Sequence, residues 1–474
     1  MLVIPTAPPS ASAEVPLSDD VLRRFDTPGP RYTSYPTADR FVDTFGAADA
    51  DLALSRRAAH MPASDTEPLS VYVHIPFCES LCYYCACNKV ITKHHERAAE
   101  YLDVLEAELE LVVARLGRGQ PVAQLHFGGG SPTFLSDGEL KRLVRALQAA
   151  FSFSADVEMS IEVDPRTVTP ERLHALRLLG FNRLSFGVQD FDPDVQQAVH
   201  RVQPYESVRL LMDCARNLGF TSINADLIYG LPKQTPASFA RTLEQIGELR
   251  PDRIALYAYA HLPTRFKPQR RILAEDLPGP AQRTQMLGAA IRSFLSRSYE
   301  YIGMDHFAIA DDALAAAKRE GRLQRNFQGY STHKDCDLIA LGTSAIGRVG
   351  ATYYQNAKTL PEYCDAVRNG RLPVVRGVSL TDDDVLRRRV IMDLMCQGRL
   401  DFKAVEGAFG IGMQRYFAKE LQRLASLAEQ GLVDLDATGV VVTPKGWYLV
   451  RAIAMVFDKY LQIEARPERF SRVL

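Results

Sequence analysis

The stretch SVYVHIPFCESLCYYCACNK (residues 70–89) decides the fold, because a β-rich apolar run passes directly into a loop of closely spaced cysteines. Comparable runs recur along the chain, mostly separated by segments with helical spacing such as residues 94–115. They are VAQLHFGGG (122–130), EMSIEVDP (158–165), RLSFGVQ (183–189), SINADLIYGLP (222–232), RIALYAYAH (253–261) and the short YIGMDHF (301–307). Short apolar strands joined by helices predict βαβ units and a parallel sheet. We therefore expect an α/β fold, either a full or partial barrel or a doubly wound open sheet, because periodicity does not reveal closure.

Residues able to do chemistry accumulate where the predicted strands end. In parallel α/β folds, ligands bind at the carboxyl ends of the strands. Five consecutive strands bring such residues there: the cysteine loop after the first, Gly128 to Ser131 after the second, Glu162 and Asp164 at the third, Gln189 at the fourth and Asp226 in the fifth. Any one of them could be an ordinary strand-ending residue. Their joint alignment predicts one binding rim.

The composition is that of a globular protein large enough for two or three folding units. The 474 residues include 46% hydrophobic and 24% charged residues, and the net charge is −1. A chain this close to neutrality has no overall field that would attract nucleic acid or an anionic membrane. We also find no apolar run of about 18 residues, so we expect no membrane span.

The eight cysteines are distributed unevenly. Cys78, Cys82, Cys85 and Cys87 fall within ten residues, whereas the other four are scattered. The first three form C-x3-C-x2-C, a spacing at which three thiolates can hold one face of an iron-sulfur cluster. Zinc is the alternative, but a structural zinc site normally draws ligand pairs from separated segments. If Cys87 were a fourth ligand, the cluster would be closed and suited to electron transfer only.

An ordered set of motifs resembles the oxygen-independent coproporphyrinogen III oxidases, or coproporphyrinogen dehydrogenases, of the radical S-adenosylmethionine (SAM) superfamily. The three-cysteine loop and GGGSPT (128–133) resemble the superfamily as a whole. The closer resemblance lies in GPRYTSYPTA (29–38), YVHIPFCESLCYYCACNK (72–89), IEVDPR (161–166), RLSFGVQDF (183–191), DLIYGLPKQT (226–235), YAHLP (259–263), IGMDHFA (302–308) and NFQGYST (326–332). It extends from about residue 29 to the final FSRVL.

The resemblance implies a 4Fe-4S cluster and two SAM molecules. Cys78, Cys82 and Cys85 match the cluster ligands, and Cys87 matches a family cysteine that does not bind iron. Positions that contact the first SAM are matched by Tyr72, Gly129, Glu162 and Ile346. Those around the second are matched by Tyr84, Gly130, Ser131, Gln189, Arg201, Asp226 and Ala260. Tyr84 and Ser131 replace the more common Phe and Thr but keep an aromatic ring and a hydroxyl group.

The same resemblance implies an activity and its partners. Two propionates of coproporphyrinogen III would be oxidatively decarboxylated to vinyl groups, giving protoporphyrinogen IX, with an external electron donor and acceptor. Tyr72, His74, Cys87 and Arg201 are the residues predicted to act at the reacting centre. His74 is included because it lies on the same strand face as Tyr72. Arg31 is a further candidate for binding a substrate carboxylate. We expect a monomer that works anaerobically in the cytoplasm.

The resemblance and the repeat pattern together predict three regions. Residues 1–28 read as a flexible leader, 29–370 as the radical SAM catalytic domain with a substrate-proximal segment at 29–69, and 375–474 as a mainly helical domain. Within the last region, GLVDLDATGVVVTPKGWYLV (431–450) predicts a winged-helix-like hairpin followed by a helix. Asp434 and Asp436 flank its first strand, so we expect a packing or lid role instead of DNA binding.

Two other functions remain open from the sequence. A haem-binding chaperone related to this family keeps the three-cysteine loop, although such relatives generally lack the GPRYTSYPT segment and the cysteine at position 87. A plain electron-transfer protein would use Cys87 as a fourth ligand. A SAM-induced change in the spectrum of the reduced cluster would require an open iron and so separate these readings.

Overall fold

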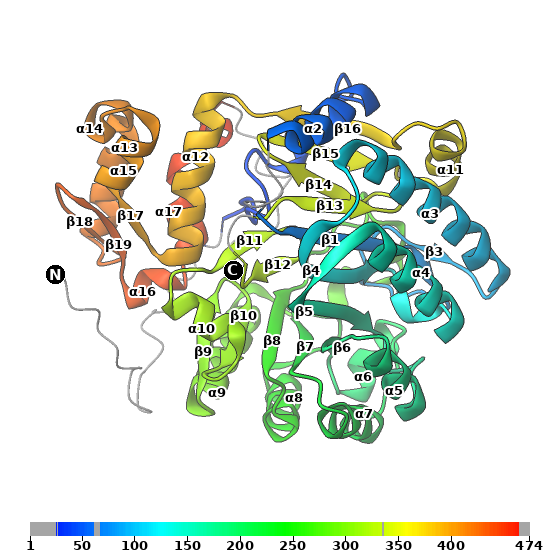
Figure 1. Cartoon of the computed structure of the whole chain (residues 1–474). Coiled ribbons are helices and arrows are strands. Elements are labelled where there is room, and N and C mark those ends of the chain that lie inside the picture. The colour runs from blue at the N-terminus through cyan, green and yellow to red at the C-terminus, as the bar shows by residue number, and fades with distance from the viewer. Residues whose placement is uncertain (1–24, 26, 61–66, 334–335, 464–474) are drawn as a thin grey trace.

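The fold is built on a twelve-stranded sheet (Figure 1), seen in a computed structural model that describes residues 25, 27–60, 67–333 and 336–463. From one edge to the other the strands are β16 (Val374–Ser379), β15 (Thr352–Asn356), β14 (Ile346–Val349), β13 (Leu338–Leu341), β1 (Leu69–Ile75), β4 (Gln120–Gly129), β5 (Phe151–Val163), β6 (Arg183–Gln189), β7 (Ser222–Tyr229), β8 (Arg253–Ala258), β10 (His306–Ile309) and β9 (Tyr299–Gly303). The predicted α/β class is confirmed.

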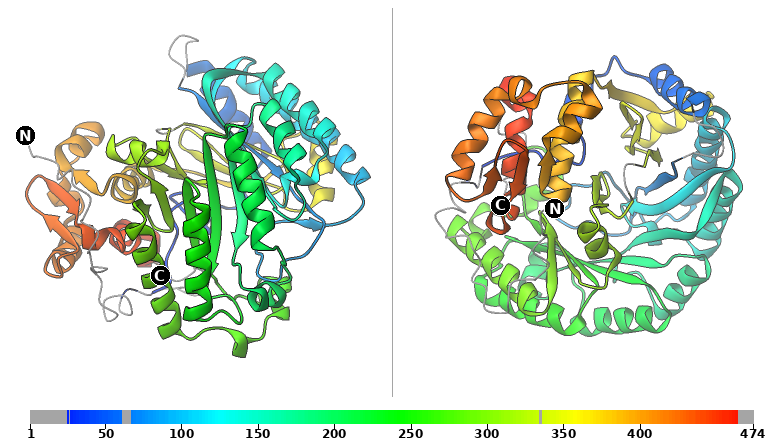
Figure 2. Two further views of the ribbon diagram at one scale, coloured as in Figure 1. Left: turned by 90° about the horizontal axis from the view of Figure 1, so that it is seen from below. Right: turned by 60° about the vertical axis from the view of Figure 1, so that its left-hand side comes forward.

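The sheet is a partial barrel. Neighbours from β13 through β8 pair in parallel, whereas the pairs at both edges are antiparallel. β9 and β16 form the two edges, and Figure 2 shows the sheet strongly curved. The prediction that residues 301–307 form one short strand of the parallel repeat is wrong. This segment contains the turn of the β9–β10 hairpin, because Gly303 (φ 150°) and Met304 (φ 48°) reverse the chain there.

Helices cover the outer face of the parallel strands (Figure 1). They are α3 (Glu96–Leu116), α4 (Asp137–Ala150), α5 (Pro170–Leu178), α7 (Tyr205–Asn217), α8 (Pro236–Leu249) and α9 (Pro280–Ser296). Local sequence sets their starts: Ser136 and Glu139 form a reciprocal cap before α4, and the Thr235 side chain caps α8.

Strand burial alternates because the two faces of the sheet meet different surroundings. In β7, Ile223, Ala225 and Leu227 are fully buried against the helices, whereas Asn224 and Asp226 are only partly buried. Side chains alternate across a strand, so the partly buried set lines the inside of the curve. The inner side of β7 is therefore polar, whereas its outer side is apolar.

The amino ends of the strands are closed by paired polar side chains. Arg253 Nε donates to Asp312 at 2.7 Å, and Ser222 donates to the same carboxylate at 2.7 Å. A two-stranded hairpin, β11 (Gln324–Asn326) and β12 (Gly329–Ser331), lies inside the curve (Figures 1 and 2). It is fastened there by a bond from Ser331 to Gln124 of β4 at 2.8 Å.

A second hydrophobic core joins the two ends of the chain. It contains α12 (Asp382–Met392), α13 (Phe402–Phe409), α15 (Ala418–Ala428), α17 (Val450–Ala454) and a three-stranded sheet of β17 (Arg399–Asp401), β19 (Gly439–Val442) and β18 (Val433–Leu435). Tyr32 and Tyr35 of the 29–38 motif are fully buried in this core. Arg451 donates to the carbonyls of Gly29 and Pro30. The amino-terminal motif is therefore held by the carboxyl-terminal region.

The other α-helices lie around these two cores, except that α6 packs in a third, smaller hydrophobic cluster. They are α2 (Ala47–His60), α6 (Pro193–Ala198), α10 (Ala313–Arg319), α11 (Leu360–Arg368), α14 (Met413–Tyr416), α16 (Pro444–Trp447) and α18 (Lys459–Ile463). The predicted leader and the final FSRVL lie almost entirely outside the described residues, and the predicted division into regions stays a prediction. Within the described part of the chain, no helix combines the length and apolarity needed to cross a bilayer.

Candidate functional site

The cysteine loop leaves the sheet at the carboxyl end of β1. Its base is closed by β2 (Phe77–Cys78) pairing with β3 (Val90–Ile91). Cys82 is buried, Cys78 and Cys85 are partly buried, and Cys87 is exposed. The loop thus presents its first three thiols from one short, anchored segment.

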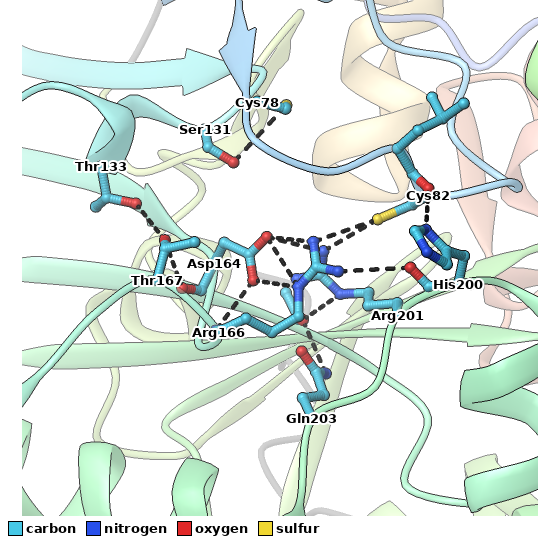
Figure 3. Close-up of polar contacts among 12 residues, drawn as sticks. Cys78, Cys82, Ser131, Thr133, Asp164, Arg166, Thr167, His200, Arg201 and Gln203 are labelled. Atoms are coloured by element: carbon cyan, nitrogen blue, oxygen red, sulfur yellow. Dashed lines mark hydrogen bonds and ion pairs between the residues drawn. The ribbon is translucent and has the colours of Figure 1, made fainter. Parts of the chain in front are cut away.

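Cys82 faces two guanidinium groups (Figure 3). Arg201 Nη1 lies 3.4 Å and Arg166 Nη2 3.5 Å from the Cys82 sulfur. Both arginines also contact Asp164, at 3.2 Å and 2.6 Å. Burial opposes ionisation of Asp164, yet the two guanidinium groups hold its pKa below the usual value. The network places two guanidinium groups and one carboxylate beside the Cys82 sulfur.

The glycine run after β4 lets the backbone pass close to the loop. Gly130 N–H donates to Ile75 O at 2.8 Å, and a Cβ at Gly130 would lie 2.7 Å from Pro76 and Phe77 backbone atoms. Ser131 follows, and its hydroxyl lies 3.8 Å from the Cys78 sulfur. A larger residue at position 130 would push this segment away from the cysteine loop.

The environment of the thiols fits a cluster better than a single ion. A hydrogen bond with Cys87 and the nearby Lys89 ammonium lower the pKa of Cys85 to about 6. Among the described residues, no three His, Cys, Asp or Glu side chains converge as they would around one metal ion. Three cysteines on one loop, with an O–H group near the Cys78 sulfur and N–H groups near the Cys82 sulfur, suit an iron-sulfur cluster. Burial raises the pKa of Cys78 to about 12.

Tyr72, His74, His126 and Glu162 form a connected group on the inner face of β1, β4 and β5. His74 Nε2 lies 3.1 Å from Asn88 O, which can only accept, so Nδ1 accepts from Tyr72 Oη at 3.1 Å. Tyr72 stacks on His126, with ring centres 5.9 Å apart.

Glu162 is the ionised member of this group. It accepts from Gly129 N–H at 3.1 Å, and His126 Nε2 lies 3.5 Å away. Burial opposes ionisation, but these contacts hold the pKa of Glu162 below its usual value. Its side chain is still 43% exposed, so an incoming ligand can reach it.

Asp226 occupies a second inward position, two strands from Glu162. Ser185 Oγ donates to it at 3.1 Å and Asn224 Nδ2 at 2.8 Å. Burial and the negative charge of Glu162 raise its pKa to about 6. Across β6, Glu162 aligns with Asn224, so Asp226 lies two strands away and two residues further along, which separates the two backbone positions by about 12 Å.

The other predicted residues surround this region. Gln189 ends β6 with φ 68°, and its side-chain amide lies near Gly187 and Arg201. The carbonyls of Tyr84 and Ala260 both accept from Gln269 Nε2, at 2.9 Å and 3.2 Å. Ile346 begins β14, beyond β13. Which ligands these residues bind stays a prediction.

The structure shows two sets of contacts that the sequence does not predict. Arg31 forms an ion pair with Asp305, and its guanidinium lies 5.4 Å from the Tyr257 ring centre, so it is already partnered. Sequence reasoning does not identify Arg166 as a site residue. Arg166 is the last residue of the IEVDPR motif, and that motif is the sequence signal that could have identified it. Its role depends on sharing Asp164 with Arg201, 35 positions away in the sequence, and this pairing exists only in the folded chain.

Comparisons with known proteins match both the parallel-sheet region and the carboxyl-terminal region of the chain. Residues 72–246 match the radical SAM superfamily, and residues 380–449 match the HemN C-terminal domain. The oxygen-independent coproporphyrinogen III oxidase of Pseudomonas aeruginosa is 50% identical over 459 residues, which cover 96% of this chain and 98% of that protein. The protein of the same name from Escherichia coli is 49% identical over 454 residues, with the same coverage. A solved Escherichia coli structure, described as coproporphyrinogen III oxidase (HemN), a radical SAM enzyme, has a TM-score of 0.87 and 49% identity, covering 91% of this chain and 98% of that one.

Proposed function

This chain belongs to the oxygen-independent coproporphyrinogen III oxidase family, and from this premise we propose that it converts coproporphyrinogen III to protoporphyrinogen IX without oxygen. Each of two propionates would lose a hydrogen atom and carbon dioxide, one electron would pass to an external acceptor, and a vinyl group would remain. The observation that supports this most is the three-cysteine loop at the carboxyl end of β1, in a partial barrel whose inner face carries Glu162 and Asp226.

In this proposal Cys78, Cys82 and Cys85 hold a 4Fe-4S cluster, and Cys87 does not. When bound, the cluster and SAM supply the 5′-deoxyadenosyl radical, and the protein supplies binding and orientation. Arg166 and Arg201 stabilise the Cys82 thiolate from one side. Cys87 is exposed, and its thiol hydrogen-bonds to that of Cys85, so in this proposal Cys87 lies next to a cluster ligand without binding iron.

Two SAM sites are also part of the proposal. The ionised Glu162, with Tyr72, Gly129 and Ile346, would accept hydrogen bonds from the first. Asp226, two strands away, would bind the second together with Tyr84, Gly130, Ser131, Gln189, Arg201 and Ala260. The backbone spacing of about 12 Å between Glu162 and Asp226 supports two separate ligand positions. Tyr72 and His74 would orient one another through their shared bond. We further propose a cytoplasmic monomer with an external electron donor.

The decisive experiment is an anaerobic assay of the reconstituted protein with coproporphyrinogen III, SAM and a reductant. Vinyl product appearing together with 5′-deoxyadenosine would establish the function. Haem binding with no SAM cleavage would instead support a chaperone.

The ligand assignment has its own test, an iron and sulfide count on single variants. Cys78→Ala, Cys82→Ala and Cys85→Ala are each expected to lose most of the bound iron. Cys87→Ala and the matched control Cys214→Ala should keep it, because neither thiol is assigned to the cluster. Iron loss in Cys87→Ala would contradict the open-iron arrangement.

A further inference from the structure

We propose that a cationic pocket between the β11–β12 hairpin, β14 and α12 binds the propionate carboxylates that the substrate retains in its product. This inference rests on the proposed function and assigns a new part of its substrate site. The cavity is small, with a volume of about 20 Å³, and it is open to solvent on one side. Its walls come from three parts of the chain: Thr33 of the amino-terminal motif, barrel residues such as Gln124 and Ser331, and Arg388 of α12.

Arg325 is the residue that points most directly to an anionic ligand. Its side chain is buried, with only 5% of the residue exposed. Nε donates to Arg31 O at 3.0 Å, and the guanidinium lies 4.7 Å from the Tyr330 ring centre. Nη1 is buried and has no hydrogen-bond partner within the described part of the chain. A buried cation without a carboxylate is costly to keep, and an incoming anion would satisfy it.

The rest of the wall has the same sign of charge. Arg348 and Arg388 also line the cavity, and none of its described lining residues carries a carboxylate. Arg348 Nη2 donates to Cys336 O at 2.7 Å, and Arg388 Nε donates to Tyr353 Oη at 3.0 Å. These bonds hold the two guanidinium groups in place beside the cavity. Guanidinium groups bind carboxylates through paired hydrogen bonds, so Arg325 and Arg388 beside one space suit a carboxylate. Arg348 adds positive charge to the wall, although it also lies 3.9 Å from the Asp337 carboxylate.

The position of the pocket suits the unreacted side of a tetrapyrrole. Gln124 lines it, and Gly129 at the carboxyl end of the same strand is five residues further, or about 17 Å along β4. The two propionates that become vinyl groups lie on one edge of the macrocycle, and the two that remain lie on the opposite edge. A carboxylate held at Arg325 would therefore leave the reacting edge free to face the cysteine loop.

The test measures anaerobic binding of coproporphyrinogen III and of its tetramethyl ester to Arg325→Gln. We expect binding of the free acid to weaken about 10- to 100-fold, the usual effect of losing a charge-assisted hydrogen bond. Binding of the ester should be unchanged, because it brings no anion to the pocket. In turnover KM should rise while kcat changes little, since the reacting edge is untouched.

Two further variants separate charge from folding. Arg325→Lys should recover part of the affinity, because it keeps the cation. Arg322→Gln removes an exposed charge three residues away and should bind the acid as the wild type does. If Arg325→Gln unfolds, Arg388→Gln takes its place. We expect Arg388→Gln likewise to weaken binding of the free acid more than binding of the ester.

Several results would overturn the pocket assignment. One is unchanged affinity of folded Arg325→Gln for the acid, and another is equal affinity of the wild type for acid and ester. A third is inorganic phosphate occupying the pocket without competition from coproporphyrinogen, which would make it a site for small anions. Failure of the wild type to bind or convert coproporphyrinogen at all would instead overturn the proposed function.

Discussion

Replacing Asp226 with asparagine should stabilise the protein at neutral and alkaline pH. Asp226 lies inside the barrel, where burial and the charge of Glu162 raise its pKa from 3.8 to about 6. The native state therefore binds this proton more tightly than the unfolded chain does. Between these two pKa values the unfolded state holds fewer protons, so the free energy of unfolding falls as pH rises. Asparagine cannot ionise and avoids that loss.

The size of the effect follows from the shift. Each pKa unit corresponds to about 1.4 kcal/mol, so ionised Asp226 destabilises the fold by about 3 kcal/mol at pH 8. At pH 5 the same relation gives about half of that, and well below the unfolded pKa it gives nothing. The amide oxygen introduced by Asp226→Asn can still accept the bond that Asn224 now gives to the carboxylate at 2.8 Å. Relative to wild type, Asp226→Asn should therefore gain about 1–2 kcal/mol between pH 5 and pH 8.

Urea denaturation of both proteins without cofactors, at pH 5 and pH 8, measures this difference. Asp156→Asn is the matched control, because it removes one negative charge from an exposed position on β5. Asp226→Asn should also lose turnover if Asp226 binds the second SAM, a gain in stability at the expense of function. A stability gap between Asp226→Asn and wild type that is equal at both pH values, or larger at pH 5, would refute the reasoning.

Two further perturbations test packing around the site and between the chain ends. Gly129 has φ 117°, and a Cβ there would lie 2.6 Å from the His74 ring. Gly129→Ala should therefore lower the free energy of unfolding, measured by thermal denaturation, by about 2–4 kcal/mol. The control Gly138→Ala should not destabilise the protein, because a Cβ there would meet no atom within 4 Å. Tyr32→Phe removes the bond to Asp458 at 3.0 Å and should cost about 1–3 kcal/mol. Faster hydrogen exchange in both segments 29–36 and 450–463 would accompany that loss; an effect on one segment alone would contradict their joint anchoring.

Much of the site could be predicted from sequence because its parts are local. The thiols of Cys78, Cys82 and Cys85 share one loop, and the glycines at 128–130 share one turn, so spacing alone predicts a soft-metal site with close backbone approach. Alternation within β7 predicts that Asp226 faces away from the helices. The ligand identity, by contrast, came from the resemblance and not from these local patterns.

Sequence by itself determined the parallel α/β core, the cysteine loop and the rim at the strand ends, since helical and strand periods and chain spacing are properties of adjacent residues. Tertiary structure alone decided that the sheet stays open, that Arg166 and Arg201 share Asp164 beside Cys82, and that Arg325 Nη1 is buried without a partner among the described residues. It also joined Tyr32 to Asp458 across 426 positions of the chain. Such contacts depend on how distant segments pack against each other, and no local pattern encodes the partner that a buried charge will meet.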